Sequence, residues 1–93
     1  MNVNFKSIDE VLPHAERYSI HRILHTYARK SGSIFTMGDN ANMYIDLKNG
    51  EEYKMNMDDF VRLLEIHNNH VFIKSERTDL GNRYTLYVNC QHL

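Results

Sequence analysis

The chain has a single cysteine, no long apolar run and almost no net charge, and each of these shortages excludes a class of protein. It holds one cysteine among its 93 residues, so no disulfide can form within it, which favours a reducing compartment. No apolar run is long enough to cross a membrane, and the N-terminal residues lack the basic-then-apolar order of a signal peptide. The composition therefore predicts a cytoplasmic protein with no membrane partner.

The chain also lacks a large net charge. Its formal charge of −1 argues against a general binder of polyanions. Hydrophobic residues make up 42% and charged residues 25%, which are globular values, and the length suffices for one modest core. We therefore expect a single domain over residues 1–93.

The small net charge conceals an uneven distribution along the sequence. Residues 1–33 carry a balance of +2, residues 34–66 a balance of −4, and residues 67–93 a balance of +1. Such asymmetry can orient an encounter with a partner, although an ordinary solvated surface is the plain alternative.

The clearest pattern in the chain predicts a helix over residues 19–31. Its apolar residues recur at the spacing of one buried stripe: Ile20, Ile23, Leu24, Tyr27 and Ala28. Ser19 is the expected N-cap, and Gly32 the residue that ends the helix. The exposed side carries the residues that we predict contact a partner: Arg17, Tyr18, Arg22, His25, Arg29 and Lys30.

The segment before it, residues 7–17, also has helical spacing. Ser7 and Glu10 form a capping-box pattern at its start. Pro13 removes a backbone donor, so either the helix kinks there or a short turn precedes a second start. Two helical pieces are therefore expected in place of one straight rod.

The pattern after Gly32 changes to that of strands and one further helix. Strand-like runs cover residues 33–37, 42–47 and 51–56, and Asn49-Gly50 predicts a two-residue type I′ turn between the last two. Asn56 is the expected cap of a helix over 57–67, with Asp58 and Asp59 in its first turn.

Two more strands, 70–76 and 83–89, form a C-terminal hairpin around residues 78–82. The whole order predicts an α+β fold with two N-terminal helices and a mainly antiparallel five-stranded sheet. That sheet would consist of a three-strand meander, then a helix, then the C-terminal hairpin. Tyr44 and Tyr87 share strand faces with Asp46 and Asn89, so we expect both tyrosines to be exposed.

Candidate metal ligands are present, but their spacing is not that of a known zinc site. His21 and His25 lie one helical turn apart, and Cys90 and His92 could complete a tetrahedral set. The neighbouring arginines repel a cation, and no paired-cysteine motif exists. We therefore expect no metal and no cofactor, and keep a small zinc-binding protein as an alternative.

No arrangement of residues predicts catalysis. Cys90 has only His92 near it in sequence as a base. Asp58 and Asp59 could be considered a carboxylate pair, but the helix dipole already explains acidic residues in the first turn of a helix. The sequence lacks a phosphate-binding loop and a nucleophile elbow. We expect no enzyme and no catalytic residues.

Binding of a macromolecule is the remaining class of function. Arginine and tyrosine are favoured interface residues, so the leading hypothesis is a small protein-binding module. Ten asparagines, one proline and no tryptophan are typical of AT-rich coding. This bias favours a phage or mobile-element protein that inhibits or redirects a host or defence factor by occupying its surface.

The main alternative is a nucleic-acid-binding regulator that uses the basic helix 19–31. Arg22 and Arg29 would then contact phosphates or guanine edges. The acidic central segment opposes this function, although a homodimer would double the basic charge. We identify no protein family whose motifs fit these residues.

Overall fold

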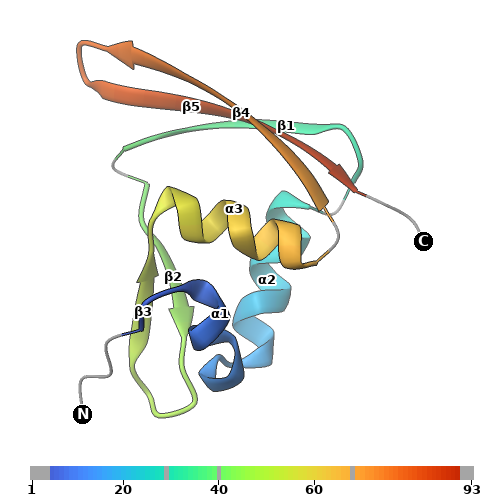
Figure 1. Cartoon of the computed structure of the whole chain (residues 1–93), viewed down its shortest axis with the longest axis vertical. Helices are drawn as coiled ribbons and strands as arrows, with labels where there is room; N and C mark the ends of the chain where they lie inside the picture. Colours follow the sequence, from blue (N-terminus) through green and yellow to red (C-terminus); the bar gives the residue numbers. More distant parts are fainter. Residues whose placement is uncertain (1–4, 29, 40, 68, 91–93) are drawn as a thin grey trace.

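The chain folds into helices and antiparallel strands, which confirms the predicted α+β class (Figure 1). The computed structural model describes residues 5–28, 30–39, 41–67 and 69–90. The elements follow in the order α1 (Ile8–Val11), a 3-10 turn η1 (Leu12–His14), α2 (Arg17–Tyr27), β1 (Ser33–Gly38), β2 (Met43–Asp46), β3 (Glu52–Met55), α3 (Met57–Ile66), β4 (Asn69–Thr78) and β5 (Gly81–Cys90).

The strands form two separate sheets, so the predicted single five-stranded sheet is wrong. One sheet has three strands in the order β1-β5-β4, and the other is the hairpin β2-β3. The predicted meander fails because β1 pairs with β5 and not with β2. After β1 the amide of Asp39 donates to the carbonyl of Asn82, which keeps this turn beside β5 before the chain leaves toward β2.

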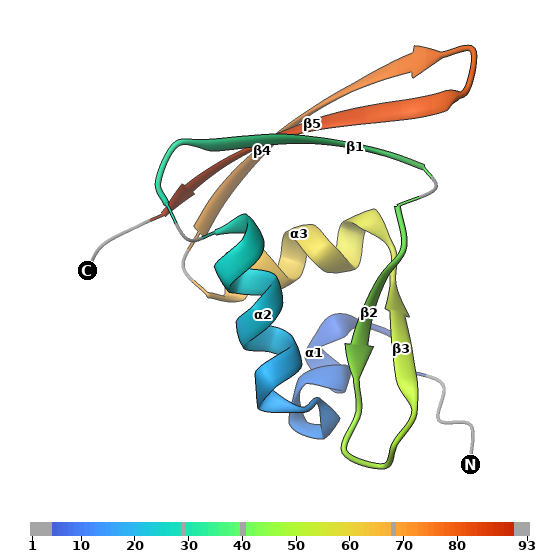
Figure 2. The ribbon, with the colours of Figure 1, turned by 180° about the vertical axis from the view of Figure 1, so that it is seen from behind.

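The helices all lie on one side of the three-stranded sheet (Figures 1 and 2). α3 packs directly under the sheet, and the hairpin β2-β3 stands beside the helices. Among the described residues, the opposite face of the sheet is covered by no helix and no strand. This arrangement leaves one sheet face open.

Helix α2 begins and ends earlier than predicted. It starts at Arg17 after the N-cap residue Glu16 and ends at Tyr27, whereas the sequence predicted 19–31. Ser19 is not a cap: it is fully buried, and its hydroxyl oxygen accepts a hydrogen bond from the amide of Asp46 at 3.0 Å. Gly32 lies in the loop before β1, with a φ of +83° that favours glycine.

The N-terminal segment is shorter than the predicted helix 7–17. Four residues of α1 lead directly into η1, in which Pro13 occupies the first turn, where its missing donor costs no hydrogen bond. Ser7 makes no side-chain capping bond. The carboxylate of Glu10 accepts instead from the amide of Lys6 at 2.8 Å. Of the two alternatives at the proline, a kink or a short turn before a second start, the structure has the short turn.

Helix α3 begins as predicted, with Asn56 as its cap. The amide of Asp59 donates to the Asn56 side chain at 2.7 Å, and the Asp59 carboxylate accepts from the Asn56 amide at 3.4 Å. These reciprocal bonds form a capping box. The same carboxylate oxygen accepts from the Tyr53 hydroxyl at 2.7 Å, which joins the start of α3 to β3.

The hairpin β2-β3 is confirmed, but its turn is not the predicted two-residue type. The amide of Leu47 donates to the carbonyl of Glu51, and the amide of Gly50 donates to the carbonyl of Leu47. These bonds enclose three residues, 48–50, and Gly50 has a φ of +89°. This is a turn followed by a glycine bulge, so only one residue needs the left-handed conformation.

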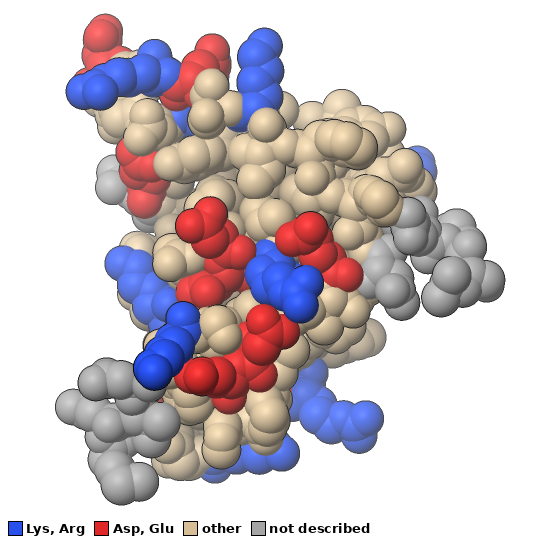
Figure 3. All heavy atoms as spheres, viewed as in Figure 1, with Lys and Arg blue, Asp and Glu red and all other residues tan. Residues whose placement is uncertain are grey.

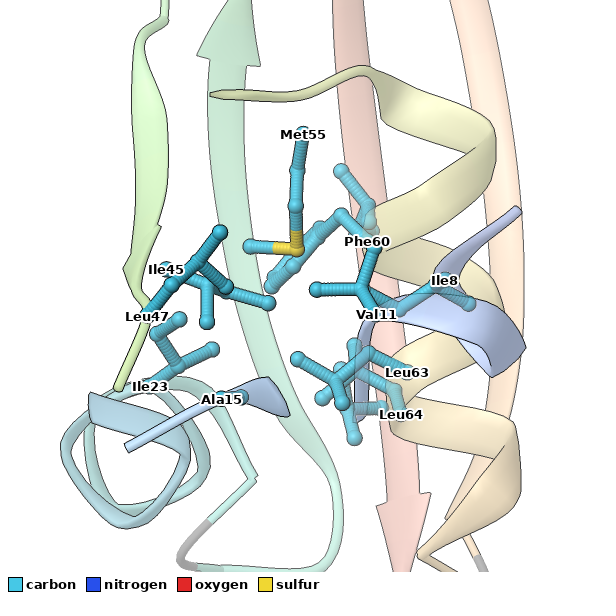
Figure 4. Close-up of a cluster of buried hydrophobic side chains, with 12 residues drawn as sticks. Ile8, Val11, Ala15, Ile23, Ile45, Leu47, Met55, Phe60, Leu63 and Leu64 are labelled. Carbon is cyan, nitrogen blue, oxygen red and sulfur yellow. The ribbon is translucent and has the colours of Figure 1, made fainter. Parts of the chain in front are cut away.

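The core lies where the helices meet the hairpin and the sheet. Figure 4 shows side chains of β2 and α3 that point toward one another, among them Ile45 and Phe60, both fully buried. The rings of Tyr27 and Phe35 both contact Phe60, with centroids 5.1 and 6.0 Å from it, and so link α2 and β1 to α3. In the described part of the chain, no helix has the length and apolar character needed to cross a membrane.

Candidate functional site

The exposed side of α2 carries most of the residues predicted to contact a partner. Arg17, Tyr18, Arg22 and His25 are all exposed on this helix, and Lys30 is exposed in the loop that follows. Arg29 lies outside the described residues. Neither Arg17 nor Arg22 forms a side-chain ion pair with a described residue.

Tyr18 has a structural partner as well as an exposed ring. Its hydroxyl donates to the carboxylate of Asp46 on β2 at 2.6 Å. This hydrogen bond to an anion raises the pKa of the Tyr18 hydroxyl, because ionisation would place two negative charges together. The hydroxyl therefore anchors α2 to the hairpin, and only the ring surface remains for a partner.

The candidate metal ligands are only partly within the described residues. The rings of His21 and His25 lie parallel on α2, with centroids 6.2 Å apart and planes at 16°. The side chain of Cys90 and all of His92 lie outside the described part of the structure. Across the residues that are described, no group of three or more His, Cys, Asp and Glu residues is placed to hold a metal ion.

Acidic side chains gather on a different side of the molecule. Figure 3 shows them over α1 and α3, where the exposed acids are Asp9, Glu10, Asp58 and Glu65. Arg62 lies among them and pairs with Asp9 at 3.4 Å. Figures 1 and 2 place α2 and α3 on opposite sides of the helical layer, so these acids and the exposed arginines of α2 lie on different sides of the molecule.

The open face of the three-stranded sheet carries a row of large apolar side chains. Ile34 of β1 is opposite Tyr87 of β5, and Tyr87 is opposite Phe72 of β4. Their exposed fractions are 64% for Ile34, 39% for Tyr87 and 62% for Phe72. The rings of Phe72 and Tyr87 are 6.3 Å apart between centroids. We call these three residues the apolar row.

Polar side chains border the apolar row on both sides. Thr36, Thr85 and Lys74 are in register with one another in the next row on this face. Asn89 and His70 form the pair on the other side. The open face therefore has an apolar centre and a polar rim, which is the composition of many protein interfaces.

Sequence reasoning found one member of this row and missed two. The exposure of Tyr87, like that of Tyr44, was predicted and is confirmed. Ile34 and Phe72 were assigned no role, although each stands next to another apolar residue in its strand. Because neighbouring strand residues point to opposite faces, one of each pair must face away from the helices. That rule could have predicted an exposed apolar residue in each strand, although not which residue of the pair it is.

A hollow of about 530 Å³ lies where β1, the hairpin β2-β3 and the start of α3 meet. Four of the five methionines line it: Met37, Met43, Met55 and Met57. Asp39 at its edge accepts from the amide of Asn82 at 2.8 Å, and this carboxylate raises the pKa of the Tyr84 hydroxyl through a hydrogen bond. The methionines give the hollow a flexible apolar part, while Lys54, Asn56, Asp58 and Ser75 add polar groups to its lining.

The comparisons with known proteins place this chain in no family. Searches of protein-family models, of curated proteins and of solved structures return no significant match.

Proposed function

We propose that this protein is a small non-enzymatic protein-binding module whose main contact surface is the open sheet face. The observation that carries the proposal is the apolar row of Ile34, Tyr87 and Phe72. A contiguous exposed apolar patch with a polar rim is typical of interaction sites. The three side chains stand on three hydrogen-bonded strands, so a partner meets a surface that is already ordered.

The two charged faces give the proposed complex an orientation. The acids of α1 and α3 and the basic residues of α2 are exposed on different sides of the helical layer. Complementary charges on a partner would speed association and select one approach, while the apolar row contributes most of the affinity.

The more specific proposal is a cytoplasmic phage or mobile-element protein that inhibits or redirects a host or defence factor. Its support is the compositional bias toward asparagine, the single cysteine and the small size. A protein of this kind acts by covering a surface of its target, for which an ordered apolar face is suited.

One observation favours nucleic-acid binding as a second candidate. Phe72 and Tyr87 present two exposed rings on a sheet, and aromatic rings can stack on bases. Lys74 next to them and the exposed arginines of α2 could contact phosphates. The acidic face opposes this candidate through repulsion of phosphates.

Affinity purification of the full chain, with and without nuclease, distinguishes the two candidates. A protein partner that stays bound after nuclease treatment supports the main proposal. Retention of nucleic acid alone, with an affinity that falls steeply as salt rises, would contradict it, because phosphate contacts release counterions. Elemental analysis of the same purified protein tests the alternative that it binds zinc. That alternative requires one zinc ion per chain in the wild type and its loss in the His25→Ala variant.

A further inference from the structure

A second surface with a distinct chemistry lies beside α2. It is a hollow of about 370 Å³ between α2, the segment that follows α1, and the end of α3. Apolar side chains form its floor: Leu12, Ala15, Ile20, Leu24 and Ile66. We call it the α2 hollow.

The apolar floor is exposed because its residues lie at the border of the core. Ile20 and Leu24 are one turn apart on α2 and are half-buried, beside the fully packed stripe of that helix. Ile66 is also half-buried, and its position on α3 lies away from the stripe that contains Phe60 and Leu64. Each side chain contacts the core and still offers apolar surface to the hollow.

The rim of the hollow has basic character. Arg17, His21 and His67 line it and are exposed, and among the described residues no acid lines it. The His67 ring is oriented by a hydrogen bond from Nδ1 to the carbonyl of Leu63 at 3.1 Å. The guanidinium of Arg17, which pairs with no described acid, can bind a carboxylate through two parallel hydrogen bonds.

From this geometry we infer that the α2 hollow binds an acidic segment of a partner protein. An apolar side chain of that segment fills the floor, and neighbouring Asp or Glu residues pair with Arg17 and His21. The volume lies within the range of small-molecule pockets, about 300–1,000 Å³, so it leaves room for an apolar side chain of the segment. The inference rests on the proposed function, since it requires a protein partner, but it concerns a surface separate from the apolar row.

Selection from a displayed library of random short peptides against the full chain tests the inference. The selected peptides should be enriched in Asp or Glu beside Leu, Ile or Phe. Arg17→Glu should weaken the binding of such a peptide about tenfold or more, because it replaces attraction with repulsion. The variant should fold, since an acid in the first turn of α2 favours the helix dipole.

Arg77→Glu near the end of β4 is the matched control, because it makes the same substitution at an exposed site remote from the α2 hollow and should leave affinity unchanged. Selection of no peptide, or of peptides without acids, would overturn the inference. Binding that is lost in Phe72→Thr but kept in Arg17→Glu would also overturn it, while supporting the proposed use of the sheet face. Failure of the proposed function itself would appear separately, as retention of nucleic acid alone in the purification above.

Discussion

At the scale of single residues, one aspartate of the hairpin joins elements that are far apart in sequence. Asp46 accepts from Tyr18, 28 positions away, and its amide donates to the buried hydroxyl of Ser19. Sequence reasoning predicted the cap at Asn56 correctly, because its partner is three residues away. It could not predict the role of Ser19, because that role depends on a partner 27 positions away.

The capping box of α3 provides a test at this scale. Asn56→Ala removes the acceptor for the Asp59 amide and should lower the free energy of unfolding by about 1 kcal/mol. Chemical denaturation measures the change. Asn42→Ala, at an exposed asparagine outside any helix or strand, is the control and should cost less than about 0.5 kcal/mol. Equal losses in the two variants would contradict the capping role.

Tyr53 provides a test that depends on pH. Burial and the hydrogen bond to Asp59 raise the pKa of its hydroxyl from 10.0 to about 12. Between these values the unfolded chain releases the Tyr53 proton and the folded chain keeps it, so the free energy of unfolding falls as pH rises. Tyr53→Phe should therefore show a shallower decline across this interval than the wild type. Tyr44→Phe, on the neighbouring strand, should keep the full decline, and parallel curves for all three proteins would refute the assignment.

At the scale of elements, periodicity predicts which segments are helices and strands but not which strands pair. The five predicted strands and the helix after Asn56 are all present. The pairing of the strands could not be predicted from local sequence patterns, because β1 pairs with β5, which begins more than forty residues later. In β5, Leu86 is buried and Tyr87 exposed, yet both are apolar. Apolar residues on both faces depart from the alternation expected of an antiparallel strand with one open face, and that departure was available in the sequence.

The turn of the hairpin β2-β3 gives a prediction at the element scale. Gly50 has a φ of +89° and open space where a Cβ would lie, so only backbone conformation opposes substitution. Gly50→Ala should therefore cost about 1–2 kcal/mol. Gly38 has an ordinary φ and a Cβ position 3.8 Å from the nearest backbone atom, so Gly38→Ala should cost clearly less. Thermal or chemical unfolding compares the two, and a smaller loss for Gly50→Ala would contradict the proposed turn.

At the scale of the whole molecule, the fold places its helices on one side of the three-stranded sheet and leaves the other side open (Figures 1 and 2). The predicted basic helix exists, but the sequence did not show that an apolar row would lie on the open face. That surface required the pairing of β1, β4 and β5, which brings Ile34, Tyr87 and Phe72 together. In the proposed account, the module contacts a protein through the sheet and binds an acidic segment beside α2.

The most direct test of this account compares how much partner protein two variants recover, Phe72→Thr and Leu80→Thr. Quantitative mass spectrometry after nuclease treatment measures the recovery. Both residues are exposed, Phe72 by 62% and Leu80 by 95%, but Leu80 lies in the turn between β4 and β5, outside the apolar row. We predict that Phe72→Thr lowers partner recovery at least tenfold, as expected for an aromatic residue in the apolar part of an interface, and that Leu80→Thr behaves like the wild type. Wild-type recovery by a folded Phe72→Thr variant would contradict the account.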